Sequence, residues 1–250
     1  MSEIHNSALE ILFQDEYLVA VNKPSGLLVH RSMIDRHETE FALQKVRDQI
    51  GQFVYPIHRL DKPTSGVLIF ALTKEVARSM SERFKARETH KEYVAVVRGF
   101  CEESGVIDYA LKEQLDKISD AKAKQDKEAQ SAKTLYQTLG QVEIEEAVGR
   151  YQTARYSLVK LLPETGRKHQ LRRHMKHIMH PIVGDTKHGR GEHNQLFRRK
   201  FDCHRLLLHA STIRFLHPID DKEIVVQAKL DKTFTNVLQS LGWKLENLLQ

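Results

Sequence analysis

Residues 57–72 constrain the fold of this chain more than any other stretch of its sequence. They begin with a basic, turn-rich decapeptide and continue without a break into an apolar run of strand length. Pro63 fixes one φ angle and Gly66 permits a positive one, so the decapeptide is expected to form a rigid loop. That loop places the carboxylate of Asp61 at the end of a buried strand, a common position for functional groups. Taken alone, the same Asp61 is better explained as an ion-paired turn residue.

The composition is that of an ordinary globular protein, with 40% hydrophobic and 29% charged residues. A chain of 250 residues is long enough for one large domain or for two lobes around a cleft. Its net charge of +6 is too small to establish nucleic-acid binding by itself. Cys101 and Cys203 are far apart in the sequence, which argues against a disulfide scaffold. The N-terminus lacks the apolar region of a signal peptide, and no apolar run is long enough to span a membrane. We therefore expect a cytoplasmic protein without a membrane segment.

The hydrophobic pattern predicts many short strands and four helices. Expected strands cover residues 11–13, 17–21, 67–72, 91–99, 134–139, 142–146 and 153–162, with a strand pair at 206–210 and 213–218. Residues 27–29 are expected to be extended. One helix is expected over residues 38–50 and ends at Gly51; others are capped by Thr73 and by Asp231. Residues 112–133 alternate charges of both signs, which indicates a solvated loop or a surface helix.

The fourth helix belongs to a second functional stretch, residues 162–175. Thr165-Gly166 forms a turn, after which Leu171, Met175 and Ile178 share one helical stripe while basic side chains occupy the other faces. A basic helix N-terminus that opens at a glycine can bind phosphate through free main-chain N–H groups and positive side chains. The alternative is a solvated basic face.

Two motifs together carry a resemblance to a known family. His58-Arg59-Leu60-Asp61, followed by Thr64-Ser65-Gly66, resembles the signature of the RluA-type pseudouridine synthases, and residues 165–174 are similar to that family's Thr-Gly-Arg-x-His-Gln-Leu-Arg-x-His motif. A Lys-Pro-x-Gly segment at residues 23–26 resembles its opening motif, and the similarity extends over residues 11–243. The resemblance implies an α+β fold with a mostly antiparallel mixed sheet in two lobes, a central cleft and flanking helices. We expect residues 1–250 to form one catalytic domain, with no S4-like RNA-binding domain before it.

The resemblance also implies roles for individual residues. Asp61 would be the essential catalytic carboxylate, acting as a nucleophile at C1′ or as a base at C2′ of the target nucleotide, and Arg172 would pair with it. Tyr93 would stack on the target base and Arg59 would enter the space that the base vacates. The remaining residues expected to bind RNA are His58, Lys62, Arg167, Lys168 and Arg173.

Six histidines between residues 169 and 193 raise the alternative of a metal site. His174, His177 and His180 are spaced three apart, but Pro181 limits the helix and no carboxylate or cysteine set completes a ligand pattern. The resembling enzymes use neither metal nor cofactor, so we expect none here and assign the histidines to local hydrogen bonds or to RNA phosphates. A metal-dependent hydrolase remains the competing hypothesis.

Subgroup features within the family imply a tRNA substrate, with uridine isomerised at position 65 in the T-stem. They lie at residues 29–32, 47–52, 166–174 and 185–189, although Met179 and His188 depart from the broader family's usual glycine and tyrosine. The partner expected is therefore tRNA, bound by a monomer without a small-molecule cofactor. Two alternatives stay open: a pseudouridine synthase acting on ribosomal RNA, and a non-catalytic tRNA-binding protein such as a chaperone.

Overall fold

The computed structural model describes residues 8–31, 38–113 and 128–243 of the chain. Contacts divide it into two compact units. The first unit comprises mainly the chain up to Lys91 and the later segment Ala210–Lys229. The second unit comprises Glu92–Leu111, Gln130–His209 and the chain from Leu230 onward. The expected α+β class and the mostly antiparallel strand pairing are confirmed, since every strand register that can be followed within a unit is antiparallel.

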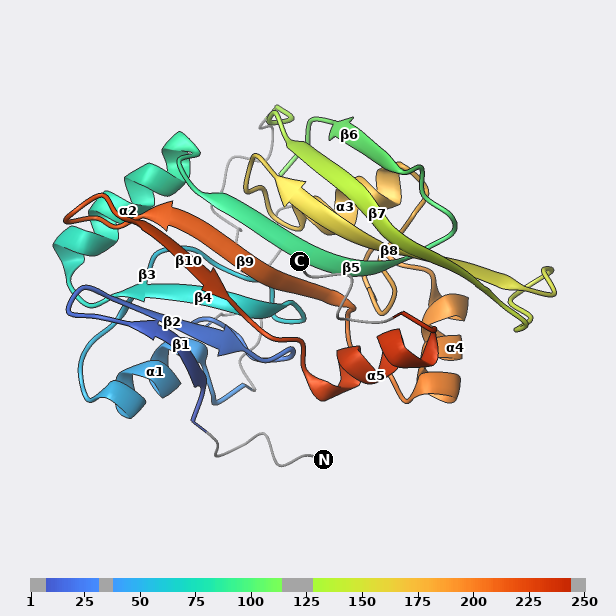
Figure 1. Cartoon of the computed structure of the whole chain (residues 1–250), viewed down its shortest axis with the longest axis horizontal. Helices are drawn as coiled ribbons and strands as arrows, with labels where there is room; N and C mark the ends of the chain where they lie inside the picture. The colour runs from blue at the N-terminus through green and yellow to red at the C-terminus, as the bar shows by residue number, and fades with distance from the viewer. Residues whose placement is uncertain (1–7, 32–37, 114–127, 244–250) are drawn as a thin grey trace. The chain divides into compact units, whose positions relative to one another are not determined.

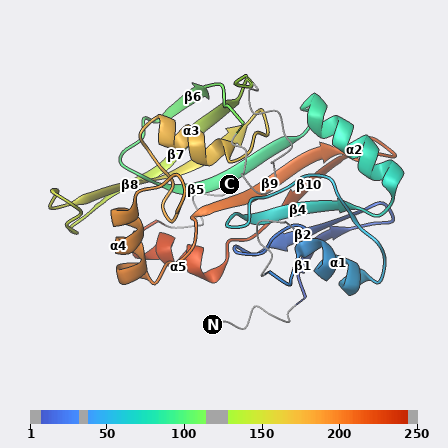
Figure 2. The ribbon, with the colours of Figure 1, turned by 180° about the vertical axis from the view of Figure 1, so that it is seen from behind.

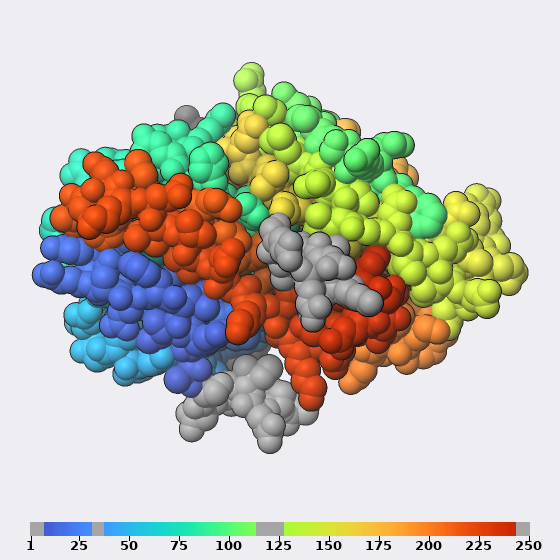
Figure 3. All heavy atoms as spheres, viewed as in Figure 1, coloured from blue at the N-terminus to red at the C-terminus, as the bar shows by residue number. Residues whose placement is uncertain are grey.

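Strands of the first unit follow the order β1-β2-β4-β9; in addition, β10 pairs with β9 and a short β3 pairs with β4. Their bounds are β1 Glu10–Gln14, β2 Leu18–Lys23, β3 Tyr55–Pro56, β4 Ser65–Ala71, β9 Leu208–Leu216 and β10 Glu223–Gln227. All seven residues of β4 are buried, as its unbroken apolar sequence predicts. In Figure 1, β1, β2 and β4 lie side by side. Figure 3 shows the blue atoms of β1 next to the orange-red atoms of β10 on the same face.

Helices α1 (Ala42–Ile50) and α2 (Lys74–Ala86) belong to the first unit, and α2 lies in front of its strands in Figure 2. The Thr73 hydroxyl accepts a hydrogen bond from the Val76 N–H at 3.2 Å, so the predicted N-cap of α2 is confirmed. The predicted start of α1 at residue 38 is wrong. Residue Phe41 is extended and bridges Leu28, and the first N–H groups of α1 donate to main-chain oxygens of that neighbouring segment. The same bridge is the only β structure in residues 27–29, which were expected to be extended.

In its described residues, the second unit contains four antiparallel strands in the order β5-β8-β7-β6 and three helices. The strands are β5 His90–Arg98, β6 Ser104–Asp108, β7 Lys133–Ile144 and β8 Ala154–Pro163; the helices are α3 Gln170–His177, α4 Gly191–Phe201 and α5 Lys232–Ser240. The Asp231 carboxylate caps α5 by accepting from the Phe234 N–H at 3.0 Å, as predicted. None of the described helices in either unit is long and apolar enough to cross a membrane.

Two strand predictions in this sequence are corrected by the structure. Residues 134–139 and 142–146 form one strand, β7, which continues through a bulge between Thr138 and Gly140. A side chain on Gly140 would collide with the indole of Trp243, so this glycine permits packing and does not end a strand. The two segments 206–210 and 213–218, predicted as a strand pair, both contribute to the single strand β9, whose antiparallel partner is β10. Strands β6 and β10 and helix α4 were not predicted, and the charged residues 114–127 lie outside the described part of the chain.

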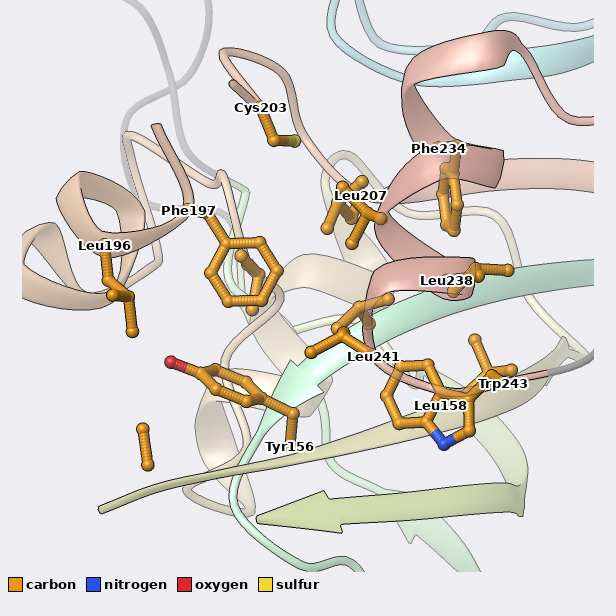
Figure 4. Packing of buried hydrophobic residues seen from close by; sticks show 14 of the residues in the cluster. Tyr156, Leu158, Leu196, Phe197, Cys203, Leu207, Phe234, Leu238, Leu241 and Trp243 are labelled. Atoms are coloured by element: carbon orange, nitrogen blue, oxygen red, sulfur yellow. The ribbon is translucent and has the colours of Figure 1, made fainter. Parts of the chain in front are cut away.

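A hydrophobic core of aromatic and aliphatic side chains joins the strands of the second unit to α4 and α5. Figure 4 shows the ring of Tyr156, from β8, directed toward Phe197 of α4, with Leu241 and Trp243 beside it. Tyr156 and Phe197 are fully buried, and their rings meet edge-on with centroids 4.9 Å apart. The core includes Val94 and Val96 of β5 and so fixes the strand that carries Tyr93.

Candidate active site

The predicted catalytic carboxylate lies on a well-braced loop of the first unit. Asp61 is half-buried between β3 and β4, and its main-chain oxygen accepts the Thr64 N–H at 3.0 Å. Thr64 is buried, and Gly66 has a φ of 112°. A side chain at Gly66 would overlap the main-chain oxygen of Ala210, so only glycine fits there. We call residues 57–66 the Asp61 loop.

A second turn, residues 23–27, holds the Asp61 loop from the side. Lys23 is fully buried, and its ammonium group donates to the main-chain oxygens of Pro24 and Leu27 at 2.8 Å and of Lys62 at 3.2 Å. The Gly26 N–H donates to the same Lys62 oxygen at 2.8 Å. Charge-assisted hydrogen bonds of this kind stabilise a buried ammonium and immobilise the carbonyls around it. The Lys-Pro-x-Gly motif and the Asp61 loop are therefore one structural assembly.

Charged and aromatic side chains surround the Asp61 loop within the first unit. Arg59 is exposed, and Lys62 forms an ion pair with Glu38 at 2.8 Å. The ring of His58 accepts the Ile69 N–H at 3.2 Å and stacks on Phe84. Burial, reinforced by the charge of Lys91, lowers the pKa of His58 to about 3. His58 is thus a neutral residue that joins the loop to β4, and its predicted contact with RNA stays a prediction.

Gln170 organises the second motif at the start of α3. Its side-chain oxygen accepts the Thr165 hydroxyl at 2.7 Å and the Arg167 N–H at 3.0 Å. Its amide nitrogen donates to the main chain of Lys133 and to the Thr134 hydroxyl, each at 3.0 Å. The turn that carries Arg167 and Lys168 is thereby tied to β7, and both of these basic side chains are exposed.

Arg172 is buried in α3, although it was expected among the basic side chains on the helix faces away from the Leu171 stripe. Its guanidinium donates from Nε to Asp185 Oδ2 at 2.7 Å and from Nη2 to Asp185 Oδ1 at 2.8 Å. Burial acts to raise the pKa of Asp185, but the hydrogen bonds and charge of Arg172 outweigh it, and the net pKa lies below its usual value. No role was predicted for Asp185 from the sequence. It was noted only as part of the subgroup feature at residues 185–189.

Tyr93 projects from β5 and is half-buried. It stands opposite Leu161 of β8 and packs against a buried cluster that contains Leu171 and Met175 of α3. The cluster therefore positions Tyr93 and the helix of Arg172 together. This arrangement is compatible both with a core aromatic and with the predicted base-stacking role.

The histidines near α3 form local hydrogen bonds, and His169 and His188 bond to each other at 3.0 Å. The ring of His174 is hydrogen-bonded to the Thr134 hydroxyl at 2.9 Å and to the main-chain oxygen of Tyr109 at 3.0 Å. The ring of His180 is hydrogen-bonded to the main-chain oxygen of Arg98 at 2.8 Å. Within the residues that the structure describes, no three His, Cys, Asp or Glu side chains are grouped so that they could hold a metal ion.

The predicted site residues fall into two sets. His58, Arg59, Asp61 and Lys62 lie in the first unit, and Tyr93, Arg167, Lys168, Arg172 and Arg173 in the second. The pairing of Asp61 with Arg172 stays a prediction.

Comparison with known proteins identifies the class to which this fold and these motifs belong. Residues 17–177, more than half of the chain, match the family model described as RNA pseudouridylate synthase, and the chain belongs to that family. It is 58% identical to tRNA pseudouridine synthase C of Vibrio cholerae serotype O1 over 241 residues, which cover 96% of this chain and 98% of that protein. It is 54% identical to the Haemophilus influenzae protein of the same name, with 94% and 99% covered. The solved structure of Human RNA Pseudouridylate Synthase Domain Containing 4 is similar with a TM-score of 0.71, 28% identity and 94% of each chain covered. The family and fold class expected from the sequence are confirmed.

Proposed function

We propose that this protein isomerises uridine to pseudouridine in tRNA, with Asp61 as the catalytic carboxylate. The observation that carries the proposal is the Asp61 loop itself. Lys23 and Gly66 brace it from two sides, so that the carboxylate is held on a rigid support as catalysis requires. The relatives named tRNA pseudouridine synthase C, which span nearly the whole chain, support tRNA as the substrate class.

The reaction breaks the N1–C1′ bond of uridine, rotates the uracil and forms a C5–C1′ bond. The proton on C5 is lost and N1 gains one, so the product is an isomer and no cofactor or energy source is consumed. Asp61 acts either by attacking C1′ to form a transient ester or by removing the C2′ proton. Both routes need an ionised carboxylate, and a cation beside it, the role proposed for Arg172, keeps it ionised.

A uridine within a helical stem must leave the base stack before its glycosidic bond can be reached. Flipping a base costs a few kcal/mol, and stacking on an aromatic ring returns about 1–3 kcal/mol. We assign the stacking role to Tyr93 and the filling of the vacated space to Arg59, which is exposed on the Asp61 loop.

Phosphate contacts are assigned to basic residues at the start of α3. Arg167 and Lys168 are exposed on the turn held by Gln170, and Arg173 lies one turn further along the helix. His58 and Lys62 complete the proposed RNA-binding set. Each phosphate that such a side chain neutralises releases counterions, so the affinity for tRNA falls steeply with salt concentration.

The finer proposal is that the target is uridine 65 in the T-stem, modified by a monomer in the cytoplasm. Absence of a cysteine pattern supports a reducing compartment. Uridine 65 itself is supported by the subgroup features of residues 29–32, 47–52, 166–174 and 185–189.

The test maps pseudouridine by carbodiimide adduct and primer extension on unmodified tRNA transcripts and on ribosomal-RNA fragments. With wild-type protein we expect one primer-extension stop in the T-stem, and with Asp61→Asn none. The two proteins are expected to bind tRNA with equal affinity. Stops confined to ribosomal RNA would preserve the chemistry and refute the substrate. Absence of stops on every RNA, with tRNA binding intact, would favour the non-catalytic binding protein.

A further inference from the structure

We infer that Asp185 is a positioning residue for the isomerisation, because it fixes the guanidinium plane of Arg172. The inference rests on the proposed role of Arg172 beside the catalytic carboxylate. Arg172 and Asp185 belong to the same unit, and the two hydrogen bonds between them, at 2.7 and 2.8 Å, form a bidentate pair. Their side chains are 6% and 0% exposed, so water does not compete for these contacts.

A bidentate contact determines orientation as well as attraction. Helix α3 fixes only the backbone of Arg172, and the long side chain beyond it has several rotatable bonds. Two parallel N–H···O bonds on Nε and Nη2 remove that freedom, since they set both the plane and the direction of the guanidinium. Lysine could satisfy the charge of Asp185 but could not reproduce this geometry.

The Asp185 carboxylate is itself held by the main chain around it. Its Oδ1 accepts the N–H groups of Lys187 and His188, both at 2.9 Å. The Asn194 amide donates to the Asp185 main-chain oxygen at 2.9 Å and accepts the Gly184 N–H at 2.8 Å, which anchors the turn to α4. Because the turn holds the Asp185 carboxylate in place, the carboxylate fixes the orientation of the Arg172 guanidinium.

Glycines on both sides of Asp185 show how closely this turn is built. Gly184 has a φ of 79°, and a side chain there would overlap the main-chain oxygen of Arg205. A side chain on Gly189 would overlap the main-chain oxygen of Asp185. The turn therefore admits little adjustment, and a change at the carboxylate is transmitted to Arg172.

The experiment is a double-mutant cycle of Asp185→Asn and Arg172→Gln, measured as kcat and KM on tRNA transcript and as the Kd for tRNA. Asp185→Asn is expected to lower kcat roughly 10²-fold, the cost of a misplaced group, and to leave Kd unchanged. In the Arg172→Gln background, Asp185→Asn is expected to have no further effect on kcat, since it acts through the arginine. The double variant replaces the ion pair by two amides and leaves no unpaired buried charge, so it remains measurable where a single variant fails to fold.

The matched control is Asp231→Asn, which weakens another arginine contact of the second unit, that of Arg205, and also the cap of α5. It is expected to lower the Tm and to leave kcat unchanged. The inference is overturned by an unchanged kcat in Asp185→Asn, or by an equal loss of kcat from Asp185→Asn in both backgrounds. If Arg172→Gln alone leaves kcat unchanged, the proposed role of Arg172 fails, and the inference fails with it; the Asp61→Asn result would still stand by itself.

Discussion

The ammonium group of Lys23 lies 3.2 Å from the main-chain oxygen of Lys62, the residue that follows Asp61. Through this contact a buried charge at the end of β2 holds the loop that carries the proposed catalytic carboxylate. Two motifs that are about forty residues apart in the sequence thus act on one short segment of main chain.

Replacing the buried lysine should affect catalysis more than binding. In Lys23→Met the methylenes are kept and the donors lost, which leaves the main-chain oxygens of Pro24 and Leu27, and that of Lys62 in the Asp61 loop, without their cation. We expect kcat to fall about 10- to 100-fold, with KM for tRNA little changed. Lys222→Met, on an exposed lysine of the same unit, is the control and should behave as wild type. Equal kinetics for the two variants would contradict a bracing role for Lys23.

Two glycines with positive φ should respond differently to alanine. Gly66→Ala meets both a strained φ and the Ala210 carbonyl, whereas Gly26→Ala, at a φ of 89°, has no neighbouring atom within 4 Å. Gly26→Ala is expected to lower the free energy of unfolding by about 1 kcal/mol. Gly66→Ala should cost several times more, on the order of 3 kcal/mol or above. Urea denaturation of both variants measures the difference, and similar losses would mean that the chain around Ala210 can move aside.

Replacement of His58 by alanine tests whether this residue has a structural role or a role in RNA binding. His58→Ala removes the acceptor of the Ile69 N–H and the stacking partner of Phe84. A buried donor left without its partner costs about 1–3 kcal/mol, so the Tm is expected to fall. The neighbouring Arg59→Ala, which removes an exposed side chain, should keep the Tm and lower kcat. If His58→Ala weakens the Kd for tRNA at an unchanged Tm, the predicted RNA contact is the correct interpretation.

Buried histidines should make the fold sensitive to mild acid. Burial, together with the charge of Arg98, lowers the pKa of His193 from 6.5 to about 4. Between these values the unfolded chain binds a proton that the folded chain excludes, so the free energy of unfolding falls as the pH falls from 6.5 toward 4. The slope is about 1.4 kcal/mol per pH unit for one such group. Urea denaturation at a series of pH values from 7 to 4 measures this slope. In His193→Gln the slope should be smaller by the contribution of one titrating group. An unaltered slope would mean that His193 does not titrate in this range.

Local signals in the sequence predicted much of the fold. The caps Thr73 and Asp231 and the terminating Gly51 act through hydrogen bonds to residues within one helical turn, so a short window of sequence contains the whole cause. The start of α1 was placed too early because its cause is not local: the N–H groups of Ala42 and Leu43 donate to residues more than ten positions earlier.

The site shows the same division between local and distant causes. The Asp61 loop was recognisable because its turn residues and its carboxylate are contiguous. The partner of Arg172 was not, since Asp185 follows it by thirteen residues and only the turn between α3 and α4 brings the two together. Residues 134–139 and 142–146 were predicted as two strands, whereas they belong to one; the glycine between them, Gly140, leaves space for Trp243, which comes from a distant part of the sequence.

The order in which the chain visits the two units has a consequence for its synthesis. The first unit takes its early strands from the N-terminal part of the chain and its last pair, β9 and β10, from residues near the C-terminus. On the ribosome, β4 therefore emerges long before its neighbour β9, and nearly the whole second unit is translated in between. No single cleavage of the chain yields either unit intact. We expect a nascent chain that stops short of β9 to expose the edge of β4 and to depend on chaperones until translation is complete.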